Sequence, residues 1–470
     1  MGTSAADELT SSLKSLDQAN HLHPFTSVAA HAADGPLVMS HGKGTRITDS
    51  KGKTYLDAFA GLWCVNVGYG REEIAEAIAA QAKKLAYYHS FLAMANEPSI
   101  RLAERLIKLT PASLGKVFFG LTGSDGNDTL IKIIWYYNNL LGRPNKKKII
   151  ARKLAYHGVT IASGSLSGLP NLHGGFDLPV DRFLHVSTPH HYRHAPAGMS
   201  EREFSAHLAK ELEDLILREG PDTIAAFFAE PVMGAGGVYV PPEGYFEAIV
   251  PVLKKYDILF AADEVICGFG RLGKWFGSQY YNFEPDLMTG AKGLTSGYVP
   301  LSMSLISDQV WQVLLEGSPT MGPFGHGFTY SAHPVAAAAA LANLDIIERE
   351  GLVDRVARLA PILQRRLREE FQDHPLVGEV RGVGFVGAIE LVTDKKTKLP
   401  FDLKLGVALR AYRKVLACGV IVRPILNNLV VSPPFVFTEE EIEELVAALK
   451  VAIDVTAAEL TAEGIWRAAS

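Results

Sequence analysis

The chain has 470 residues, of which 48% are hydrophobic and 21% are charged, and a formal net charge of −5. This length favours two or more domains, because a single core rarely exceeds about 250–300 residues. The charge offers no basic surface for nucleic acid, and no apolar run approaches the ~18 residues of a membrane span. Three separated cysteines do not form a disulfide framework, so we expect a reducing compartment and, by elimination, the cytoplasm.

The N-terminal part predicts a hairpin and two helices. Short alternating runs flank the turn Asp49–Gly52, a pattern that is typical of a β-hairpin. Residues 71–85 and 97–109 have the apolar spacing of amphipathic helices.

From residue 116 onward, short apolar runs alternate with helical patterns. We expect strands at residues 116–120, 147–152, 224–232 and 258–265, and helices at 125–142, 205–220 and 245–257. The strands are apolar along their length, as strands buried on both faces are. This alternation predicts an α/β fold with a mostly parallel central sheet that helices cover on both sides.

After residue 333 the pattern changes to long helices and a few strands. We expect an alanine-rich helix at 333–344, strands at 377–391, 419–424 and 429–434, and a last helix that opens with the capping box Thr438/Glu441. This predicts a second, smaller α+β domain. The expected division is 1–70 as an N-terminal arm and part of the small domain, 71–332 as the large domain, and 333–470 as the C-terminal small domain.

Several motifs do not predict a site. G-x-G-x-x-G occurs at 268–273 and 382–387, but neither copy leads from a strand into a helix, so a dinucleotide site is not expected. The histidines of 190–194 lie around Arg193 and predict a surface loop, not a metal site. The histidines of 21–23, for which we recognise no acid nearby, lead to the same expectation.

Four other features predict a ligand site, and a glycine-rich loop is the first. The loop "TGSDGNDT", residues 122–129, follows a strand and opens a helix. Gly123 and Ser124 lie where the backbone N–H groups of a helix N-terminus bind phosphate. Ordinary capping of the helix by Ser124 or Asp125 is the alternative.

The next two features follow strands of the predicted sheet. Tyr156 and His157 follow the strand at 147–152, where an aromatic face either stacks on a flat ring or fills the core. Asp263 ends another apolar strand, and a buried carboxylate needs a partner. A protonated ring nitrogen ~4 Å away would contribute about 4 kcal/mol before desolvation at an effective dielectric constant near 20. A structural cap or salt bridge is the alternative.

Lys292 is the fourth feature. It lies between Ala291 and Gly293 in an apolar segment. Such surroundings lower the pKa of a lysine, and a neutral amine attacks a carbonyl. A phosphate loop, a stacking ring, a carboxylate for a ring nitrogen and a nucleophilic lysine are together the parts that hold pyridoxal phosphate.

With these residues in place, the chain resembles the class III aminotransferases, which are fold type I pyridoxal-phosphate enzymes, and among them the (S)-selective ω-transaminases of the amine:pyruvate type. The resemblance covers nearly the whole chain. It is carried, in this order, by "DAFAGLWCVNVGYG", "FFGLTGSDGNDT", "AYHG", "AEPVMGAGGVYVPP", "ADEVICGFGRLG", "AKGLTSGYVPL", "HGFTYSAHPVAAAAA" and "RGVGFV". It implies a mostly parallel central sheet in a large domain and a smaller α+β domain built from both ends of the chain.

The resemblance also implies roles for single residues. Lys292 resembles the lysine that holds the coenzyme covalently and moves a proton, and Asp263 resembles the partner of the ring nitrogen. Tyr156 and Val265 resemble the residues on the two faces of the ring, and Thr329 the threonine that reaches the coenzyme phosphate of a neighbouring subunit. The expected catalytic residues are Lys292, Asp263 and Tyr156, and the expected coenzyme-binding residues are Gly123, Ser124, Tyr156, His157, Glu230, Asp263, Val265, Lys292 and Thr329.

For substrates, the resemblance implies a large pocket, a small pocket and a mobile arginine. Arg423 resembles the arginine that swings in to bind a carboxylate, and Glu230 the glutamate with which it can pair. The expected substrate residues are Phe25, Leu62, Trp63, Phe91, Tyr156, Ala235, Phe328 and Arg423, of which Phe91, Ala235 and Phe328 could face the pocket of a partner subunit. The resemblance therefore implies a homodimer with shared active sites, or a tetramer.

The expected activity is a ping-pong transfer of an amino group from a primary amine or ω-amino acid to a keto acid, with pyruvate as the expected acceptor. A decarboxylase, racemase or aminomutase on the same fold, and a catalytically silent scaffold, are the alternatives. Gly126, Pro424 and the glycine-rich 171–175 depart from the family pattern, and Gly126 is expected to weaken its helix. The donor stays open among aryl-alkyl amines, β-alanine, diamines, taurine and long-chain amines.

Overall fold

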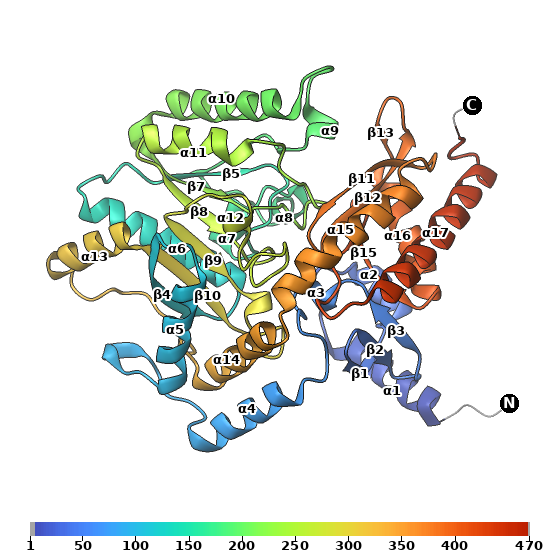
Figure 1. Ribbon diagram of the computed structural model, residues 1–470, viewed down its shortest axis with the longest axis horizontal. Helices are drawn as coiled ribbons and strands as arrows, with labels where there is room; N and C mark the ends of the chain where they lie inside the picture. Colours follow the sequence, from blue (N-terminus) through green and yellow to red (C-terminus); the bar gives the residue numbers. More distant parts are fainter. Residues whose placement is uncertain (1–4, 469–470) are drawn as a thin grey trace.

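The computed structural model describes residues 5–468, which form a central sheet and two smaller sheets (Figure 1). The central sheet has the strand order β4-β10-β9-β8-β7-β5-β6, and within it β10 runs antiparallel to both neighbours while the other strands are parallel. The prediction of a mostly parallel sheet is confirmed, and β7, β8, β9 and β10 are buried along their full length. The strands are β4 (Leu114–Gly120), β5 (Lys148–Arg152), β6 (Phe183–Val186), β7 (Ile224–Ala229), β8 (Leu259–Asp263), β9 (Leu287–Gly290) and β10 (Ser302–Ser307).

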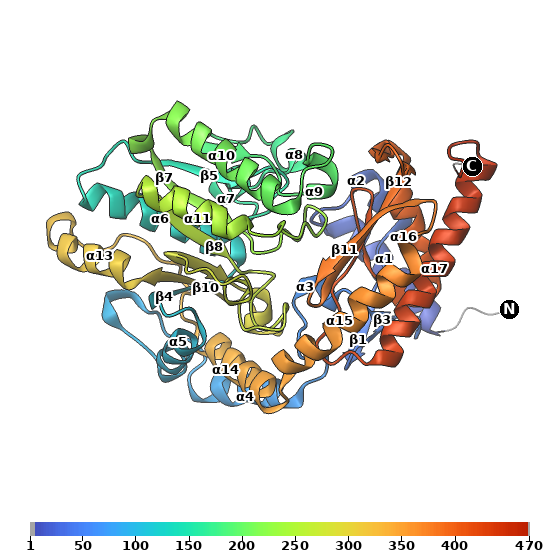
Figure 2. The same ribbon diagram turned by 45° about the horizontal axis from the view of Figure 1, so that its top comes forward.

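Helices cover both faces of this sheet. One face packs against α6, α7 and α13 in an apolar core that includes Leu130 and Ile134. The other face packs against α10 and α11, which lie side by side in Figures 1 and 2, through Leu212 and Ile249. The helices are α6 (Gly123–Leu140), α7 (Ile161–Leu166), α8 (Pro170–His173), α9 (His191–His194), α10 (Glu201–Glu219), α11 (Tyr245–Lys255), α12 (Gly277–Tyr280) and α13 (Asp308–Met321).

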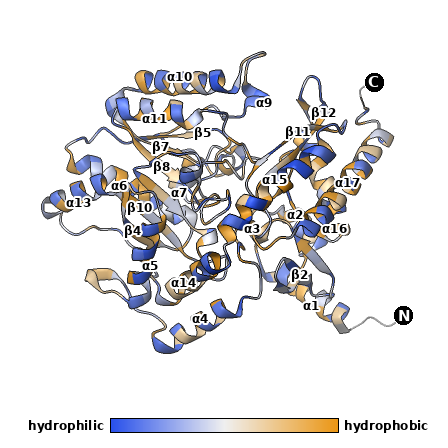
Figure 3. Ribbon diagram, viewed as in Figure 1, coloured by the Kyte–Doolittle hydropathy of each residue, from blue (hydrophilic) through white to orange (hydrophobic). Residues whose placement is uncertain are grey.

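Figure 3 shows why these helices lie on the outside. Hydrophilic and hydrophobic stretches alternate along α10 and along α17 (Glu439–Ala462), as they do in helices that pack one face and expose the other. Among residues 5–468, none of the helices combines the length and the apolar character that crossing a membrane requires.

One of the two smaller sheets brings the two ends of the chain together. In the four-stranded sheet, C-terminal β14 pairs in parallel with N-terminal β3, placing Val420 beside Leu56. The other sheet has the order β11-β12-β16-β15, with β13 paired to β12. The strands are β1 (Met39–Lys43), β2 (Arg46–Asp49), β3 (Thr54–Asp57), β11 (Val377–Val383), β12 (Val386–Asp394), β13 (Leu399–Pro400), β14 (Val420–Ile421), β15 (Arg423–Ile425) and β16 (Asn428–Val431).

The remaining helices suggest where the domains divide. α15, α16 and α17 pack with one another and with the C-terminal strands, whereas α14 packs against α4 and α5 beside the central sheet. We propose a boundary near residue 350 in place of 332, and the pairing of β3 with β14 supports joining residues 1–70 to the C-terminal part. These helices are α1 (Ala5–Asn20), α2 (Val28–Asp34), α3 (Ala60–Trp63), α4 (Glu72–Lys84), α5 (Glu97–Leu109), α14 (Pro334–Arg349), α15 (Leu352–Phe371), α16 (Val407–Ala417) and α17 (Glu439–Ala462).

Local predictions hold where capping and turn chemistry are strong. The hairpin at Asp49–Gly52 is present, with Thr48 opposite Thr54. The predicted box caps α17, since the Thr438 hydroxyl accepts from the Glu441 amide at 3.2 Å. The single strand predicted at 377–391 is wrong, because its middle glycines turn the chain back and make the hairpin of β11 and β12.

Candidate active site

A cavity of about 790 Å³ lies at the carboxyl ends of β5, β7 and β8. Its lining has two sides that come from different parts of the chain. We call the first the carboxylate side, formed by Gly123, Ser124, Tyr156, Asp263 and Lys292. We call the second the arginine side, formed by Phe25, Leu62, Trp63 and Arg423. In Figure 1, α3, which ends at Trp63, lies between the central sheet and the smaller sheets.

Asp263 is the last residue of β8 and is only 3% exposed. Its Oδ2 accepts hydrogen bonds from Nδ2 of Asn127 and from Nδ1 of His157, both at 2.8 Å. Its Oδ1 accepts from the amide of Val265 at 3.1 Å. A carboxylate oxygen has two lone pairs, so Oδ1 keeps one for a cationic group in the cavity. Two of the three partners are polar side chains that hold the carboxylate in a fixed orientation.

Lys292 follows β9 and begins the short 3-10 helix η3 (Lys292–Leu294). Its backbone is left-handed, with φ of 39°, which is uncommon for a residue other than glycine and typical of functional positions. Burial lowers the pKa of Lys292, although the nearby carboxylates of Asp263 and Glu230 act in the opposite direction. The lysine therefore reaches its neutral, nucleophilic form at a lower pH than an exposed lysine.

The N-terminus of α6 supplies backbone donors to the cavity. Its cap is Thr122, whose hydroxyl accepts from the Asp125 amide at 3.2 Å, while the Asp125 carboxylate accepts from the Thr122 amide at 3.0 Å. Capping therefore uses Thr122 and Asp125 and leaves Gly123 and Ser124 on the cavity wall. A Cβ at Gly123 would lie 2.9 Å from Cγ2 of Val265, so a larger residue would fill the space next to these backbone donors.

Gly126 packs against β9, and this contact explains its presence in the helix. A Cβ at position 126 would lie 2.8 Å from Cγ2 of Thr289. Gly126 lowers the helix propensity of α6, but it allows the helix to pack closely against the sheet. Alanine there requires a smaller residue at position 289.

Glu230 follows β7 and lies buried at 3% exposure on the cavity wall. Its carboxylate accepts from the amide of Tyr156 at 3.1 Å and from the amide of Gly234 at 2.9 Å. Burial raises the pKa of Glu230, and the charge of Asp263 adds to this effect. Glu230 thus ties the segment that carries Tyr156 to the loop that follows β7.

The arginine side has an apolar wall and one cation. Trp63 is buried with φ of 63°, and its ring packs edge-on against Phe59 at 4.7 Å between centroids. Leu62 is exposed by 51% and Phe25 by 60%. The ring of Phe25 lies 6.4 Å from that of Tyr156. Arg423 is exposed, as expected of a side chain that has room to change position.

Three predicted site residues lie away from this cavity. Phe91, Phe328 and Thr329 do not line it, whereas Ala235 does. Instead, the hydroxyl of Tyr87 donates to the carbonyl of Thr329 at 2.7 Å, and the ring of Phe91 lies against Gly327. The three residues therefore belong to one surface of the chain, where Phe91 is 47% exposed.

Sequence reasoning missed Asn127. Its Nδ2 donates both to Asp263 and to the carbonyl of His157, at 2.8 and 2.7 Å. Asn127 lies one helical turn after Gly123, so helical spacing places both on the same face of α6. This spacing is the feature of the sequence that could have identified it.

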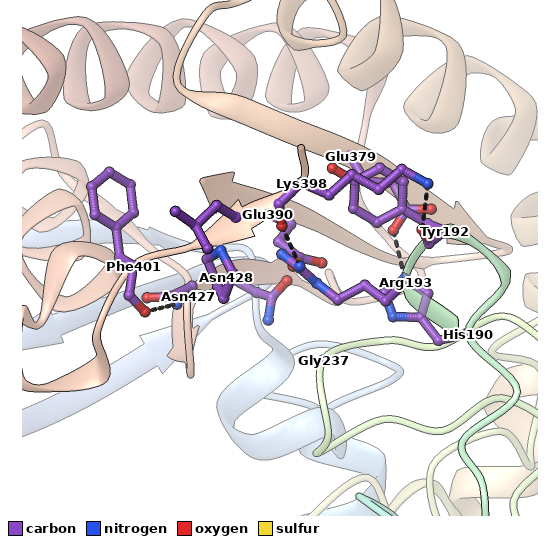
Figure 4. Close-up of polar contacts among 12 residues, drawn as sticks. His190, Tyr192, Arg193, Gly237, Glu379, Glu390, Lys398, Phe401, Asn427 and Asn428 are labelled. Carbon is purple, nitrogen blue, oxygen red and sulfur yellow. Dashed lines mark hydrogen bonds and ion pairs between the residues drawn. The ribbon is translucent and has the colours of Figure 1, made fainter. Parts of the chain in front are cut away.

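The expectation of a surface loop at 190–194 is wrong for His190. This histidine is buried and donates from Nε2 to Glu379 at 2.7 Å, because α9 packs against the C-terminal sheet (Figure 4). His190, Glu379 and Glu390 lie close enough to hold a metal ion. However, the guanidinium groups of Arg381 and Arg193 already donate to these carboxylates, which accounts for their charge.

The histidines of 21–23 also have an acid beside them, contrary to expectation. Nε2 of His23 donates to Asp17 at 2.8 Å, and Nδ1 of His21 lies 3.3 Å from the same carboxylate. Nε2 of His31 lies 2.9 Å from Oδ1 of Asp17. The hydrogen bond from His23 is the main cause that lowers the pKa of Asp17. The acid lies on α1, and the cluster fixes the segment that leads to Phe25.

The carboxylate side fits pyridoxal phosphate. Asp263 offers a lone pair for a protonated ring nitrogen, and the N-terminus of α6 offers amides for a phosphate. Beside them, Oδ1 of Asn127 and Nε2 of His157 are buried without a hydrogen-bond partner within residues 5–468. Lys292 faces the same cavity with a lowered pKa.

Comparisons with known proteins agree with this chemistry. The family model described as Aminotransferase class-III matches residues 28–453. A diaminobutyrate–2-oxoglutarate transaminase of Halomonas elongata is 49% identical, over 96% of either chain. A putrescine–pyruvate aminotransferase of Pseudomonas aeruginosa is 44% identical, over 98% of this chain and all of the relative. The solved ω-transaminase of Pseudomonas jessenii in complex with PMP is 46% identical, with a TM-score of 0.94 over 96% of this chain and 99% of the other.

The chain belongs to the class III aminotransferase family. It is a pyridoxal-phosphate-dependent aminotransferase with the fold type I architecture, in which a seven-stranded sheet is joined to smaller sheets from both chain ends.

Proposed function

We propose that this aminotransferase moves the amino group of a primary amine or ω-amino acid to pyruvate by a ping-pong mechanism. The observation that carries the proposal is the position of Lys292 and Asp263 on one side of a cavity that has Arg423 on the other. An amine donor without an acid group needs only the apolar wall, whereas a keto acid needs a cation for its carboxylate. The similarity to the putrescine–pyruvate aminotransferase of Pseudomonas aeruginosa supports the choice of pyruvate.

Residues of the carboxylate side would hold the coenzyme. Asp263 would bind the ring nitrogen, the amides of Gly123 and Ser124 the phosphate, and Val265 and Tyr156 the two ring faces. His157 would orient Asp263 through its hydrogen bond. When bound, pyridoxal phosphate accepts the electrons that are released when the substrate loses its Cα proton. The negative charge of Asp263 would keep the ring nitrogen protonated, and a protonated ring would accept these electrons more readily.

Lys292 has two tasks in this proposal. As a neutral amine it would hold the coenzyme covalently through the aldehyde, with release of water, before substrate arrives. Once the substrate amine has taken its place, the free side chain of Lys292 would act as the general base that takes the substrate Cα proton and as the acid that gives it back. Burial serves both tasks, because it lowers the pKa of Lys292.

The arginine side would choose the substrates. Arg423 would bind the carboxylate of the keto acid by a charge-assisted pair of hydrogen bonds. Trp63, Phe25 and Tyr156 would form an aromatic wall for the group that the amine carries. We propose a preference for (S)-amines, in line with the resemblance to the ω-transaminases.

A panel of amine donors tests this assignment. Aryl-alkyl amines, β-alanine, diamines and taurine are offered with either pyruvate or 2-oxoglutarate, and alanine or glutamate is measured. We expect alanine from at least one donor and a half-reaction that stops when the keto acid is omitted. Continued turnover of the amine without a keto acid would instead indicate a racemase or a decarboxylase.

We further propose a homodimer with shared active sites. The segments 85–94 and 324–330 expose apolar side chains next to one another, and Tyr87 and Tyr330 contact each other at 5.8 Å between centroids. Such a patch favours burial against a second copy. Phe91, Phe328 and Thr329 would then face the cavity of the partner, and Thr329 of the partner subunit would bind the coenzyme phosphate here. The free cysteines support a reducing compartment, which we propose is the cytoplasm.

Co-expression of two inactive variants tests the shared site. Lys292→Ala and Thr329→Glu disable different halves of a shared site, so a mixed dimer regains one intact site. We expect about one quarter of wild-type activity, since half of randomly formed dimers are mixed. The pair Lys292→Ala and Asp263→Asn is the control, because both residues belong to the same half. Recovery with neither pair would contradict the shared site.

A further inference from the structure

Arg381, on β11, connects two walls of the cavity that come from different parts of the chain. Its side chain is buried, with 7% exposure. Its Nε donates to the carbonyls of Gly237 and Val238, both at 3.0 Å, and Nη2 donates to Gly237 at 2.6 Å. Nη2 also donates to Oδ1 of Asn428 at 2.7 Å. One guanidinium group therefore contacts the loop after β7 and the start of β16.

Two carboxylates fix the direction of this guanidinium group. Its Nη1 donates to Glu379 at 2.8 Å and to Glu390 at 2.6 Å. With these bonds every N–H of the guanidinium group has an acceptor. Burial alone would lower the pKa of Arg381, but Glu390 and Glu379 raise it above its ordinary value, so the group stays charged.

The same carboxylates hold α9 of the central part. Figure 4 shows His190 and Arg193 beside Glu379 and Glu390, with Gly237 and Asn428 nearby. Nε of Arg193 donates to Glu390 at 2.6 Å. The two carboxylates are thus matched by the charges of Arg193 and Arg381, and the contact joins α9 to the C-terminal sheet.

The first wall is the 233–239 loop. Met233 and Tyr239 exchange two backbone hydrogen bonds, at 3.1 and 2.8 Å, which close the loop. Inside it, Ala235 lines the cavity. At Gly237, φ is 131°, and a Cβ would lie 2.9 Å from Nδ2 of Asn428, so only glycine permits this approach. The bonds from Arg381 to the Gly237 carbonyl therefore anchor the loop two residues away from Ala235.

The second wall is the 423–431 hairpin of β15 and β16. Nδ2 of Asn428 donates to the carbonyl of Ile425 at 3.0 Å, and the two residues are opposite each other in the hairpin. Arg423, Pro424, Ile425 and Leu426 line the cavity. Asn428 therefore transmits the position of Arg381 to the strand that carries Arg423.

We propose that Arg381 is a positioning residue that sets the separation between the 233–239 loop and the 423–431 hairpin. This separation fixes the width of the cavity between the two walls and the distance of Arg423 from the keto acid. The kinetic part of this inference rests on the proposed function, whereas the structural part does not.

Hydrogen–deuterium exchange of the purified holoenzyme tests the structural part. Arg381→Lys keeps the charge but cannot serve five acceptors. We expect faster exchange at amides in 233–239 and 425–431, with no change in the coenzyme absorbance, because Arg381 contacts neither Asp263 nor Lys292. Arg366→Lys is the matched control, since Arg366 makes a bidentate pair with Glu443 on the outer helices. It should leave both segments unchanged.

Steady-state kinetics tests the consequence for substrates. For Arg381→Lys we expect the KM for pyruvate to rise about 10-fold or more. The kcat for an amine that carries no acid group should change less. Gly237→Ala disturbs the same contact from the loop and should shift the KM in the same direction. Wild-type exchange and wild-type KM in Arg381→Lys would overturn the inference. If the wild-type enzyme transaminates none of the donors, the proposed function fails, and the exchange data still decide whether Arg381 holds the two walls.

Discussion

The carboxylate side of the cavity is formed by residues at the ends of strands in one sheet, whereas the arginine side is assembled from segments near residues 25, 62 and 423. Asp263 is held by three hydrogen bonds inside a buried network, while Phe25 and Arg423 are exposed. A site that must bind one coenzyme benefits from a rigid sheet. A site that must accept two different substrates in turn benefits from exposed side chains, such as that of Arg423, that have room to change position.

The carboxylate side should therefore tolerate the least change, and Lys292→Ala should have the largest effect. Loss of both the covalent attachment and the proton transfer should lower the rate by about 10⁴-fold or more. The protein should stay folded by circular dichroism. Lys274→Ala, at an exposed lysine between β8 and β9, is the control and should keep wild-type turnover.

Asp263→Asn comes next. It removes the charge that keeps the ring nitrogen protonated but preserves the shape of the side chain, so kcat should fall by about 10²- to 10³-fold. Glu264→Gln changes the neighbouring buried carboxylate, which binds the amides of Gly277 and Ser278 instead of facing the cavity. If the two variants lose equal activity per folded protein, Asp263 has no special role.

A change on the arginine side should affect one substrate and spare the other. Arg423→Ala should raise the KM for pyruvate by about 10- to 100-fold, which corresponds to the loss of a charged hydrogen bond. The half-reaction with an amine that carries no acid group should keep its rate, as measured by the loss of coenzyme absorbance. Arg413→Ala, at an exposed arginine on α16, controls for charge alone. Equal losses in both half-reactions would remove the distinction between the two sides.

The packing of α6 gives a smaller effect, on stability. Gly126→Ala gains up to about 1 kcal/mol of helix propensity but places a methyl group against Cγ2 of Thr289. Because overpacking costs about 1–3 kcal/mol, the free energy of unfolding should fall by about 1 kcal/mol. Thr289→Ser removes the opposing methyl group, so the double variant should recover this loss in denaturant titrations. Independent, additive effects would show that the two residues do not meet.

The smallest expected effect is a shift of a pH profile. Burial lowers the pKa of Lys292, and the carboxylates of Asp263 and Glu230 oppose that effect. Glu230→Gln removes one opposing charge, so the pKa of Lys292 should fall further. The rate rises as lysine loses its proton, so the acid limb of the amine half-reaction should move to lower pH. Glu243→Gln, at an exposed carboxylate, is the control and should leave the acid limb of the pH profile in place. A shift of the acid limb to higher pH in Glu230→Gln would contradict the expected direction of the change in the pKa of Lys292.

The contrast also explains what the sequence could predict. Asp263 and Lys292 could be recognised because each interrupts an apolar segment, and the alternation of strands and helices predicted the central sheet. Short strands such as β6 and β9 were not predicted, because runs of four residues give no clear period.

Residues that act over long sequence distances were missed. The partners of Arg381 come from four separate segments, so no local pattern predicts its role. His190 was placed on the surface because its partner Glu379 is far away in the chain. Asn127 is not predicted, although it lies next to a recognised loop, because glycine spacing does not indicate which face of the helix points inward.

The attachment of the coenzyme to Lys292 is the claim that can be tested most directly. Purified holoenzyme is treated with borohydride, digested, and examined by mass spectrometry for the reduced coenzyme on lysine. The account predicts one labelled peptide, containing Lys292, and none containing Lys274. Label on any other lysine, or no label in a protein that retains bound coenzyme, would contradict it.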